Sequence, residues 1–99
     1  MMFVATLTHP PDLCFGNKQY QADGRGWAQK MRDLAKEHKV KIHGAYICPN
    51  EHTFYFVLES DSLTAISELL GPPMLNHHSA RISPVITVEE SFGLSFVGR

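Results

Sequence analysis

Histidine and cysteine are the residues of this chain best suited to chemistry. Its 99 residues include six histidines and only two cysteines, Cys14 and Cys48. Three histidines with an open fourth position form a known catalytic zinc arrangement, and imidazole also suits copper, iron and nickel. His9, His52 and His78 would form such a site if the fold brings them together. Cys14 would then add a thiolate as fourth ligand.

Four segments have the pattern of β-strands. Residues 3–8 alternate apolar and polar side chains and stop at two prolines. Residues 41–48 and 52–59 are separated by a short polar turn, which predicts a hairpin. Residues 80–88 form the last strand, and Pro84 favours a position at the edge of the sheet.

Two segments have the period of helices. Asp23 can cap a helix whose apolar residues recur at spacings of three and four. Asp61 or Ser62 starts a second helix, which the Gly-Pro-Pro sequence at 71–73 is expected to end. Residues 10–22 show no clean period and are predicted to form a loop. A connection of that length in a small domain is more often functional than idle.

The resulting order, β-α-β-β-α-β, is the split pattern of the ferredoxin-like fold, an α+β antiparallel sheet with both helices on one face. In residues 3–7, 54–63 and 82–86 the chain resembles the dimeric α+β-barrel superfamily. That group includes small YciI-like and GYD-like proteins, muconolactone isomerases and heme-degrading monooxygenases. The resemblance implies the strand order 4-1-3-2 and a homodimer whose sheets pack face to face. We expect one such domain over 1–90, with a tail over 91–99 that lies on the partner subunit.

This strand order gathers three strand ends at one end of the domain. Residues two apart on a strand share a face, and His9, His52 and His78 are each in phase with the apolar set of their strand. Three adjacent strand ends span about 10 Å, which three imidazoles can bridge. We therefore predict that they bind a transition metal, namely zinc, copper or iron, together with Cys14. Cys48 belongs to an edge strand farther away and ranks lower.

Two other interpretations stay open. Histidines at strand ends are most often solvated or bonded to turn backbone, and His77 and His78 point to opposite faces if the chain there is extended. The second sheet face carries Tyr55 and Arg81, which would line a barrel lumen and bind a small anionic ligand, because arginine offers a fork of donors to carboxylate. The alternative function is thus a metal-free barrel that binds or converts a small organic molecule, in the manner of an isomerase or monooxygenase. His43 is assigned to neither face.

Composition excludes several classes of function. A formal net charge of −1 gives no electrostatic reason to bind nucleic acid or anionic membranes. The absence of a basic leader and of a long apolar stretch leads us to expect a soluble, cytoplasmic protein. Two cysteines are too few for a disulfide scaffold and form no CxxC pair. Neither a nucleotide nor heme is expected, because the chain lacks a phosphate-binding glycine loop and does not match the Asn/Trp/His pattern of the heme-degrading enzymes.

Overall fold

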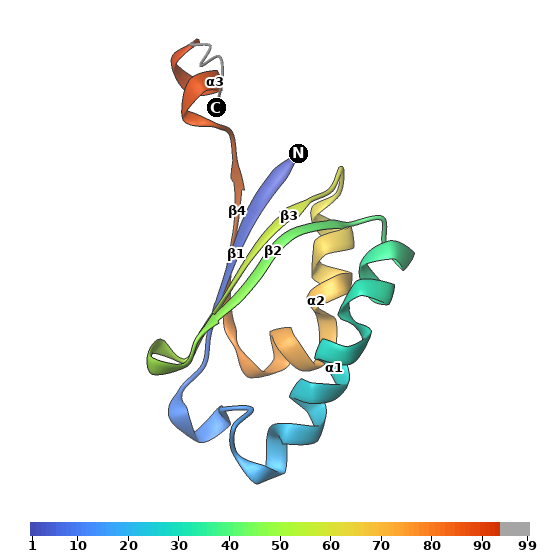
Figure 1. The fold of residues 1–99 in the computed structure, drawn as a ribbon, viewed down its shortest axis with the longest axis vertical. Helices are drawn as coiled ribbons and strands as arrows, with labels where there is room; N and C mark the ends of the chain where they lie inside the picture. Colours follow the sequence, from blue (N-terminus) through green and yellow to red (C-terminus); the bar gives the residue numbers. More distant parts are fainter. Residues whose placement is uncertain (94–99) are drawn as a thin grey trace.

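A computed structural model of the chain describes residues 1–93 (Figure 1). The elements in chain order are the strand β1 (Met2–Thr8), the 3-10 turn η1 (Pro11–Leu13), the helix α1 (Lys18–Glu37), β2 (Lys41–Cys48), η2 (Pro49–Glu51), β3 (Thr53–Glu59), α2 (Leu63–His77), β4 (Ser79–Val85) and α3 (Val88–Phe92). Within this part of the chain, no helix is both long and apolar enough to cross a membrane.

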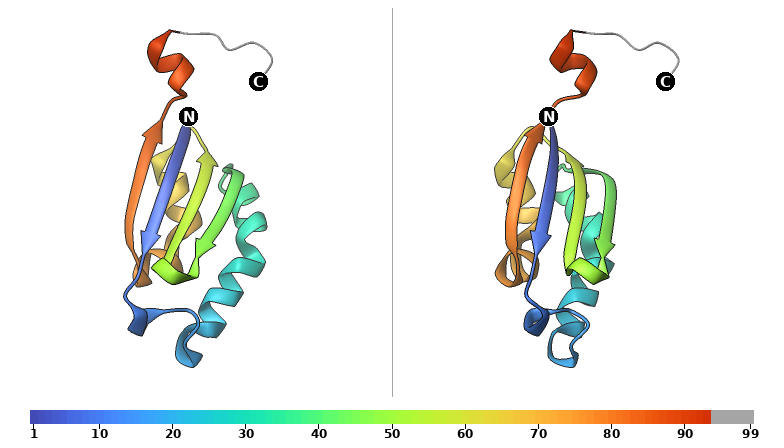
Figure 2. Two further views of the ribbon diagram at one scale, coloured as in Figure 1. Left: turned by 60° about the vertical axis from the view of Figure 1, so that its left-hand side comes forward. Right: turned by 90° about the vertical axis from the view of Figure 1, so that its left-hand side faces the viewer.

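The four strands form one antiparallel sheet in the order β2-β3-β1-β4. Read from the other edge, this is the predicted order 4-1-3-2, and the predicted α+β class is confirmed. Helices α1 and α2 both cover the same face of the sheet, while the other face is open (Figures 1 and 2). Pro84 lies on the edge strand β4. The outer side of this strand has no neighbouring strand, so a missing N–H on that side removes no hydrogen bond from the sheet.

The core lies between the sheet and the two long helices. Every second residue of β1 is buried, as expected for a strand with one covered face. The buried apolar side chains come from both layers, and they are Phe3, Ala5, Leu7, Trp27, Ala35, Val40, Phe56, Leu58, Ile66, Leu69, Leu70 and Met74.

Helix α1 starts five residues before the predicted cap at Asp23. Asn17 occupies the N-cap position, and its backbone carbonyl accepts the first helical bonds from Tyr20 and Gln21. The Asn17 side chain donates back to the carbonyls of Pro11 and Asp12, at 3.1 Å each. The predicted loop over 10–22 is therefore wrong in its second half, because this local network orders the chain without any apolar period.

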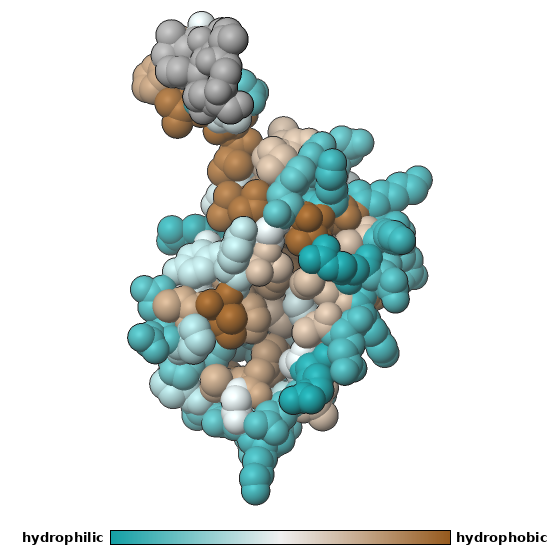
Figure 3. Space-filling model, in the orientation of Figure 1, coloured by the Kyte–Doolittle hydropathy of each residue, from teal (hydrophilic) through white to brown (hydrophobic). Residues whose placement is uncertain are grey.

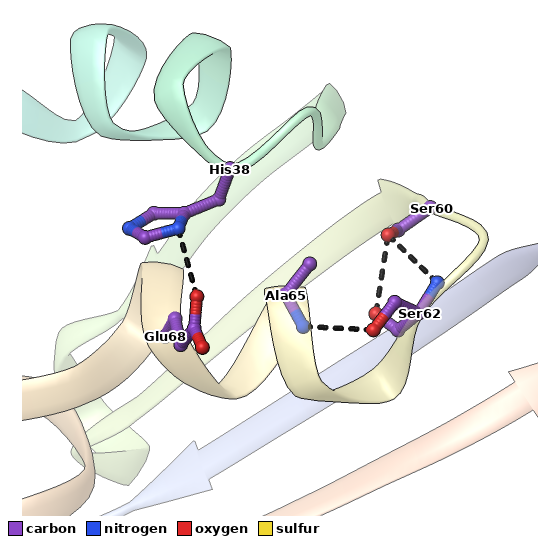
Figure 4. A network of polar contacts seen from close by, with 5 residues as sticks. All are labelled: His38, Ser60, Ser62, Ala65 and Glu68. Atoms are coloured by element: carbon purple, nitrogen blue, oxygen red, sulfur yellow. Dashed lines mark hydrogen bonds and ion pairs between the residues drawn. The ribbon is translucent and has the colours of Figure 1, made fainter.

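Helix α2 begins where predicted, at the Ser62 cap. The Ser62 hydroxyl accepts from the amide of Ala65 at 3.2 Å, and Ser60 accepts from the amide of Ser62 (Figure 4). The same view shows His38, at the end of α1, 3.0 Å from the carboxylate of Glu68 on α2. The serine contacts cap the start of α2, and the contact of His38 with Glu68 joins the surfaces of the two helices.

The predicted break at residues 71–73 is present, but a second helical segment that the prediction did not include follows it. The chain leaves helical geometry at Gly71 (φ 10°, ψ −156°) and at Pro72, and then continues as helix to His77. Proline is accommodated in the first turn of a helix, where its missing N–H has no intrahelical acceptor. The two prolines therefore kink α2 and start a second helical segment, which leads directly into β4.

The end of the described chain also differs from the prediction. Strand β4 stops at Val85 rather than Val88, because the Thr87 hydroxyl accepts from the amide of Glu90 at 3.0 Å and caps α3. This helix crosses the predicted boundary at 90, and residues 94–99 of the predicted tail lie outside the described residues. Helix α3 projects from the body, with apolar surface along its approach (Figures 1 and 3). Ile86, Val88 and Phe92 are between 61% and 71% exposed.

Candidate metal centre

The residues predicted to bind metal come from one end of the sheet. His9 directly follows β1, His52 directly precedes β3 and His78 directly precedes β4. These strands are neighbours, and the chain segments around their ends lie together at the lower end of the domain (Figure 2). Cys14 follows η1 in the connection from β1 to α1.

Three of the four predicted ligands converge. One imidazole nitrogen of His9, the sulfur of Cys14 and one imidazole nitrogen of His52 all lie within 4.8 Å of one another. His9 is at the centre of the group and only 4% exposed, whereas Cys14 and His52 are half-buried. This part of the predicted site is therefore present in the structure.

The backbone explains how His9 and His52 meet. The amide of His9 donates to the carbonyl of His52 at 3.1 Å, which extends the pairing of β1 with β3 by one step. His52 adopts the left-handed conformation (φ 51°, ψ 46°) after η2, and so does not belong to β3 as predicted. Histidine is among the residues that adopt this conformation more often than most. The parity argument for His52 thus fails, but its position beside the end of β1 holds.

Cys14 is held by a tight local turn. Its amide donates to the carbonyl of Pro11 at 3.3 Å, and its sulfur accepts from the amide of Gly16, also at 3.3 Å. These two bonds hold the sulfur in place near the end of β1, and cysteine binds metals as its thiolate. Cys48, which lies at the end of β2, is not a member of the converging group.

His78 has another position than the predicted one. Its Nε2 lies 2.9 Å from Nδ1 of His9, and its Nδ1 lies 2.6 Å from the carbonyl oxygen of Met74. Both ring nitrogens are therefore hydrogen-bonded, and His78 contacts a ligand rather than joining the converging group. His77 turns the other way, with its ring 4.8 Å from that of Tyr20 on α1. The sequence left open which of these two histidines faces the core, and in the structure it is His78.

Two imidazole nitrogens at the centre have no partner. His9 Nε2 and His52 Nδ1 are buried and make no hydrogen bond within the described part of the chain. Buried polar atoms in proteins nearly always have a hydrogen-bond partner, so such atoms call for an explanation. A metal ion between these nitrogens and the Cys14 sulfur would satisfy both.

The surroundings of the centre are aromatic. The ring of Phe15 lies 6.4 Å from that of His9 and 5.4 Å from that of His78, and Phe54 also lies 5.4 Å from His78. Burial lowers the pKa of His9, and the neighbouring His78 and His52 lower it further. Burial likewise lowers the pKa of His78, against the opposing effect of the Met74 carbonyl. Both shifts favour the neutral imidazole at His9 and His78, and neutral imidazole is the form of histidine that binds metals.

Phe15 packs against α1 at Gly24. A second glycine of the same helix, Gly26, has no such neighbour, so the two positions can be compared by substitution. A Cβ at Gly24 would come within 2.6 Å of the Phe15 ring, whereas a Cβ at Gly26 would meet no atom within 4 Å. We expect Gly26→Ala to stabilise the protein by up to about 1 kcal/mol through helix propensity. We expect Gly24→Ala to destabilise it by about 1–3 kcal/mol, because Phe15 must shift.

Urea unfolding of the two variants measures this difference. Because both positions lie in α1, the gain in helix propensity is common to both, and the difference between them isolates the packing of Phe15. Equal stabilisation by both substitutions would contradict the described position of Phe15.

The structure does not bring Tyr55 and Arg81 together. Both pair with Thr6, from opposite sides, so two strand spacings separate them on the open face. The Tyr55 hydroxyl donates to the Glu51 carboxylate at 2.8 Å. Arg81 lines a shallow hollow of about 290 Å³, formed with Thr6, Thr8, Ser79 and Ala80. A ligand held by both side chains would have to lie across Thr6.

Sequence reasoning missed the backbone groups of this centre. The Gly16 amide and the Met74 carbonyl have no signature in the residue types, although Met74 lies one helical turn before His78. Phe15 was also missed, because it lies in the segment without a period.

Comparison with known proteins points to no relative, since no family model and no curated protein matches this chain.

Proposed function

We propose that this protein binds a transition metal ion through His9 Nε2, His52 Nδ1 and the Cys14 sulfur. The observation that carries the proposal is that ligand atoms of these three side chains lie within 4.8 Å of one another, in a cluster where one buried nitrogen of His9 and one of His52 lack hydrogen-bond partners. A merely structural cluster would leave the cost of desolvating both nitrogens without compensation.

The donor set fits zinc and copper best. Zinc binds nitrogen at about 2.0–2.1 Å and sulfur at about 2.3 Å, so tetrahedral ligand atoms lie about 3.3–3.6 Å apart. The ligand atoms of the group lie within 4.8 Å of one another, so they would move closer together around the ion to reach these distances. Three protein ligands leave the fourth tetrahedral position for water or a substrate, as in catalytic zinc sites. The thiolate also suits copper(I), which makes copper the natural competitor and iron the weaker candidate.

The test of this proposal is the metal stoichiometry of untagged protein. Zinc titration against a chromophoric chelator is expected to give one ion per chain, and His52→Ala is expected to remove this binding. His43→Ala is the matched control, because His43 is a histidine of β2 whose ring is paired with Glu59 instead. Binding that survives His52→Ala, or that His43→Ala removes equally, would contradict the proposal.

We also propose that the chain forms a ferredoxin-like homodimer, which is a separate question. Its support is the open sheet face, which carries the exposed rings of Tyr46 and Tyr55 and the half-buried Val4 and Val57. A second copy is the occupant that would cover such a mixed face while leaving the metal centre, on the helix side, unaffected. A monomeric mass by light scattering at micromolar concentration would contradict this assembly.

A further inference from the structure

We propose that His78 is a positioning residue of the metal centre, which holds His9 in the tautomer with its proton on Nδ1 and its lone pair on Nε2. The inference rests on the proposed function for its purpose, but the proton placement also applies to the metal-free chain. It gives His78 a role distinct from that of a ligand.

The hydrogen bonds determine each proton in turn. The carbonyl oxygen of Met74 can only accept, so the contact of 2.6 Å requires a proton on His78 Nδ1. A neutral imidazole has only one N–H, which leaves His78 Nε2 as an acceptor. The contact of 2.9 Å between His78 Nε2 and His9 Nδ1 then requires the proton to be on His9 Nδ1. His9 Nε2 therefore carries a lone pair.

The opposite arrangement needs a charged His78. A protonated His78 would donate from both nitrogens, and His9 would then carry its proton on Nε2. The contacts of His78 are the His9 ring, the Met74 carbonyl and the rings of Phe15 and Phe54, so within the described residues no carboxylate contacts it to compensate for that charge. In that charged arrangement the proton on His9 Nε2 would be a buried N–H without an acceptor.

The first acceptor in this chain of hydrogen bonds, from Met74 through His78 to His9, comes from the end of α2. We call this chain the relay. The carbonyl of Met74 would ordinarily accept the amide of residue 78, four positions later. His78 has already left the helix, in an extended conformation (φ −130°, ψ 150°), as the chain turns into β4. Its imidazole replaces its amide as the donor, so the unsatisfied end of a helix orients the side chain.

This hydrogen bonding prepares His9 to bind a metal ion. His9 presents an unprotonated nitrogen to Cys14 and His52, and its ring cannot rotate without breaking the bond to His78. Partners that fix the tautomer of a metal-binding histidine in this way typically contribute about 10–100-fold in affinity.

The proton placement is tested directly by NMR. Long-range ¹H–¹⁵N correlation spectra of the metal-free, ¹⁵N-labelled protein at pH 7.5 should show His9 with a pyrrole-type Nδ1 and a pyridine-type Nε2. The reverse pattern at His9 would overturn the inference, whatever the protein does with metal.

Variants test the role of the relay in binding. His78→Phe keeps an aromatic ring but no acceptor, and we expect it to weaken zinc affinity about 10–100-fold. His78→Gln places an amide oxygen near the former Nε2 and should recover most of that loss. His77→Phe is the control, because His77 contacts Phe15 and Tyr20 instead and should bind zinc like the wild type.

The outcomes separate this inference from the proposed function. Unchanged affinity in His78→Phe would overturn the positioning role, as would a loss of the same size in His77→Phe. Wild-type protein that binds no zinc would overturn the proposed function, and the tautomer spectrum would still decide the state of His9.

Discussion

Zinc is expected to raise the Tm of this protein by roughly 10–20 °C when free zinc is about a hundred times the dissociation constant. A ligand that binds only the folded chain at that ratio stabilises it by about 2.7 kcal/mol. For a domain of this size, each kcal/mol shifts Tm by about 4–8 °C. The rise should be large because the ligands come from two distant parts of the chain, residues 9–14 and residue 52, which only the fold brings together.

Cys14→Ser is expected to remove most of this rise. Losing the thiolate should weaken affinity at least about 100-fold, which leaves about 0.4 kcal/mol of stabilisation at the same zinc concentration. Cys48→Ser is the matched control, since Cys48 lies at the end of β2 outside the converging group. Differential scanning calorimetry with and without zinc compares the rise within each variant. A rise of equal size in both variants would place zinc elsewhere on the chain.

The location of the centre could be predicted because it depends on strand direction and order. His9 and His52 lie at strand ends that meet in an antiparallel pair, and an error of one residue in either boundary leaves both at the same end of the sheet. The Cys14 prediction held for a similar reason, since a segment that follows His9 by a few residues cannot leave that end. Topology alone therefore predicts which end of the sheet these residues share.

The roles within the centre could not be predicted from residue types. His78 was expected to be a ligand, and only the distance to Met74 shows that its second nitrogen is already bonded. The acceptor is a backbone carbonyl released by the end of a helix, and the Gly-Pro-Pro sequence was expected to end that helix several residues earlier. The conformation of His52 could not be predicted either. His52 is a left-handed residue after a 3-10 turn, and such a residue interrupts the alternation of faces on which the strand prediction relied.

Trp27 connects the two helices at this kink. Its indole N–H donates to the carbonyl of Leu69 at 3.0 Å, in the buried layer between α1 and α2. That carbonyl would ordinarily accept from the residue four positions later, which is Pro73 and has no N–H. The chain's only tryptophan therefore satisfies a carbonyl that the proline leaves without its helical donor.

Trp27→Phe is accordingly expected to destabilise the protein by about 2–4 kcal/mol. The Leu69 carbonyl would stay buried without its donor, at a cost of about 1–3 kcal/mol, and the smaller ring would leave a cavity beside Phe56. Met31→Leu, a volume-conserving change on the same helix, should cost less than about 1.5 kcal/mol. Urea unfolding followed by circular dichroism measures both, and slow exchange of the indole N–H in the wild type reports the bond itself. A cost for Trp27→Phe no greater than that of Met31→Leu would show that water replaces the indole at this carbonyl. In that case apolar packing alone would hold the segment of α2 after the kink in place, and with it Met74 and His78.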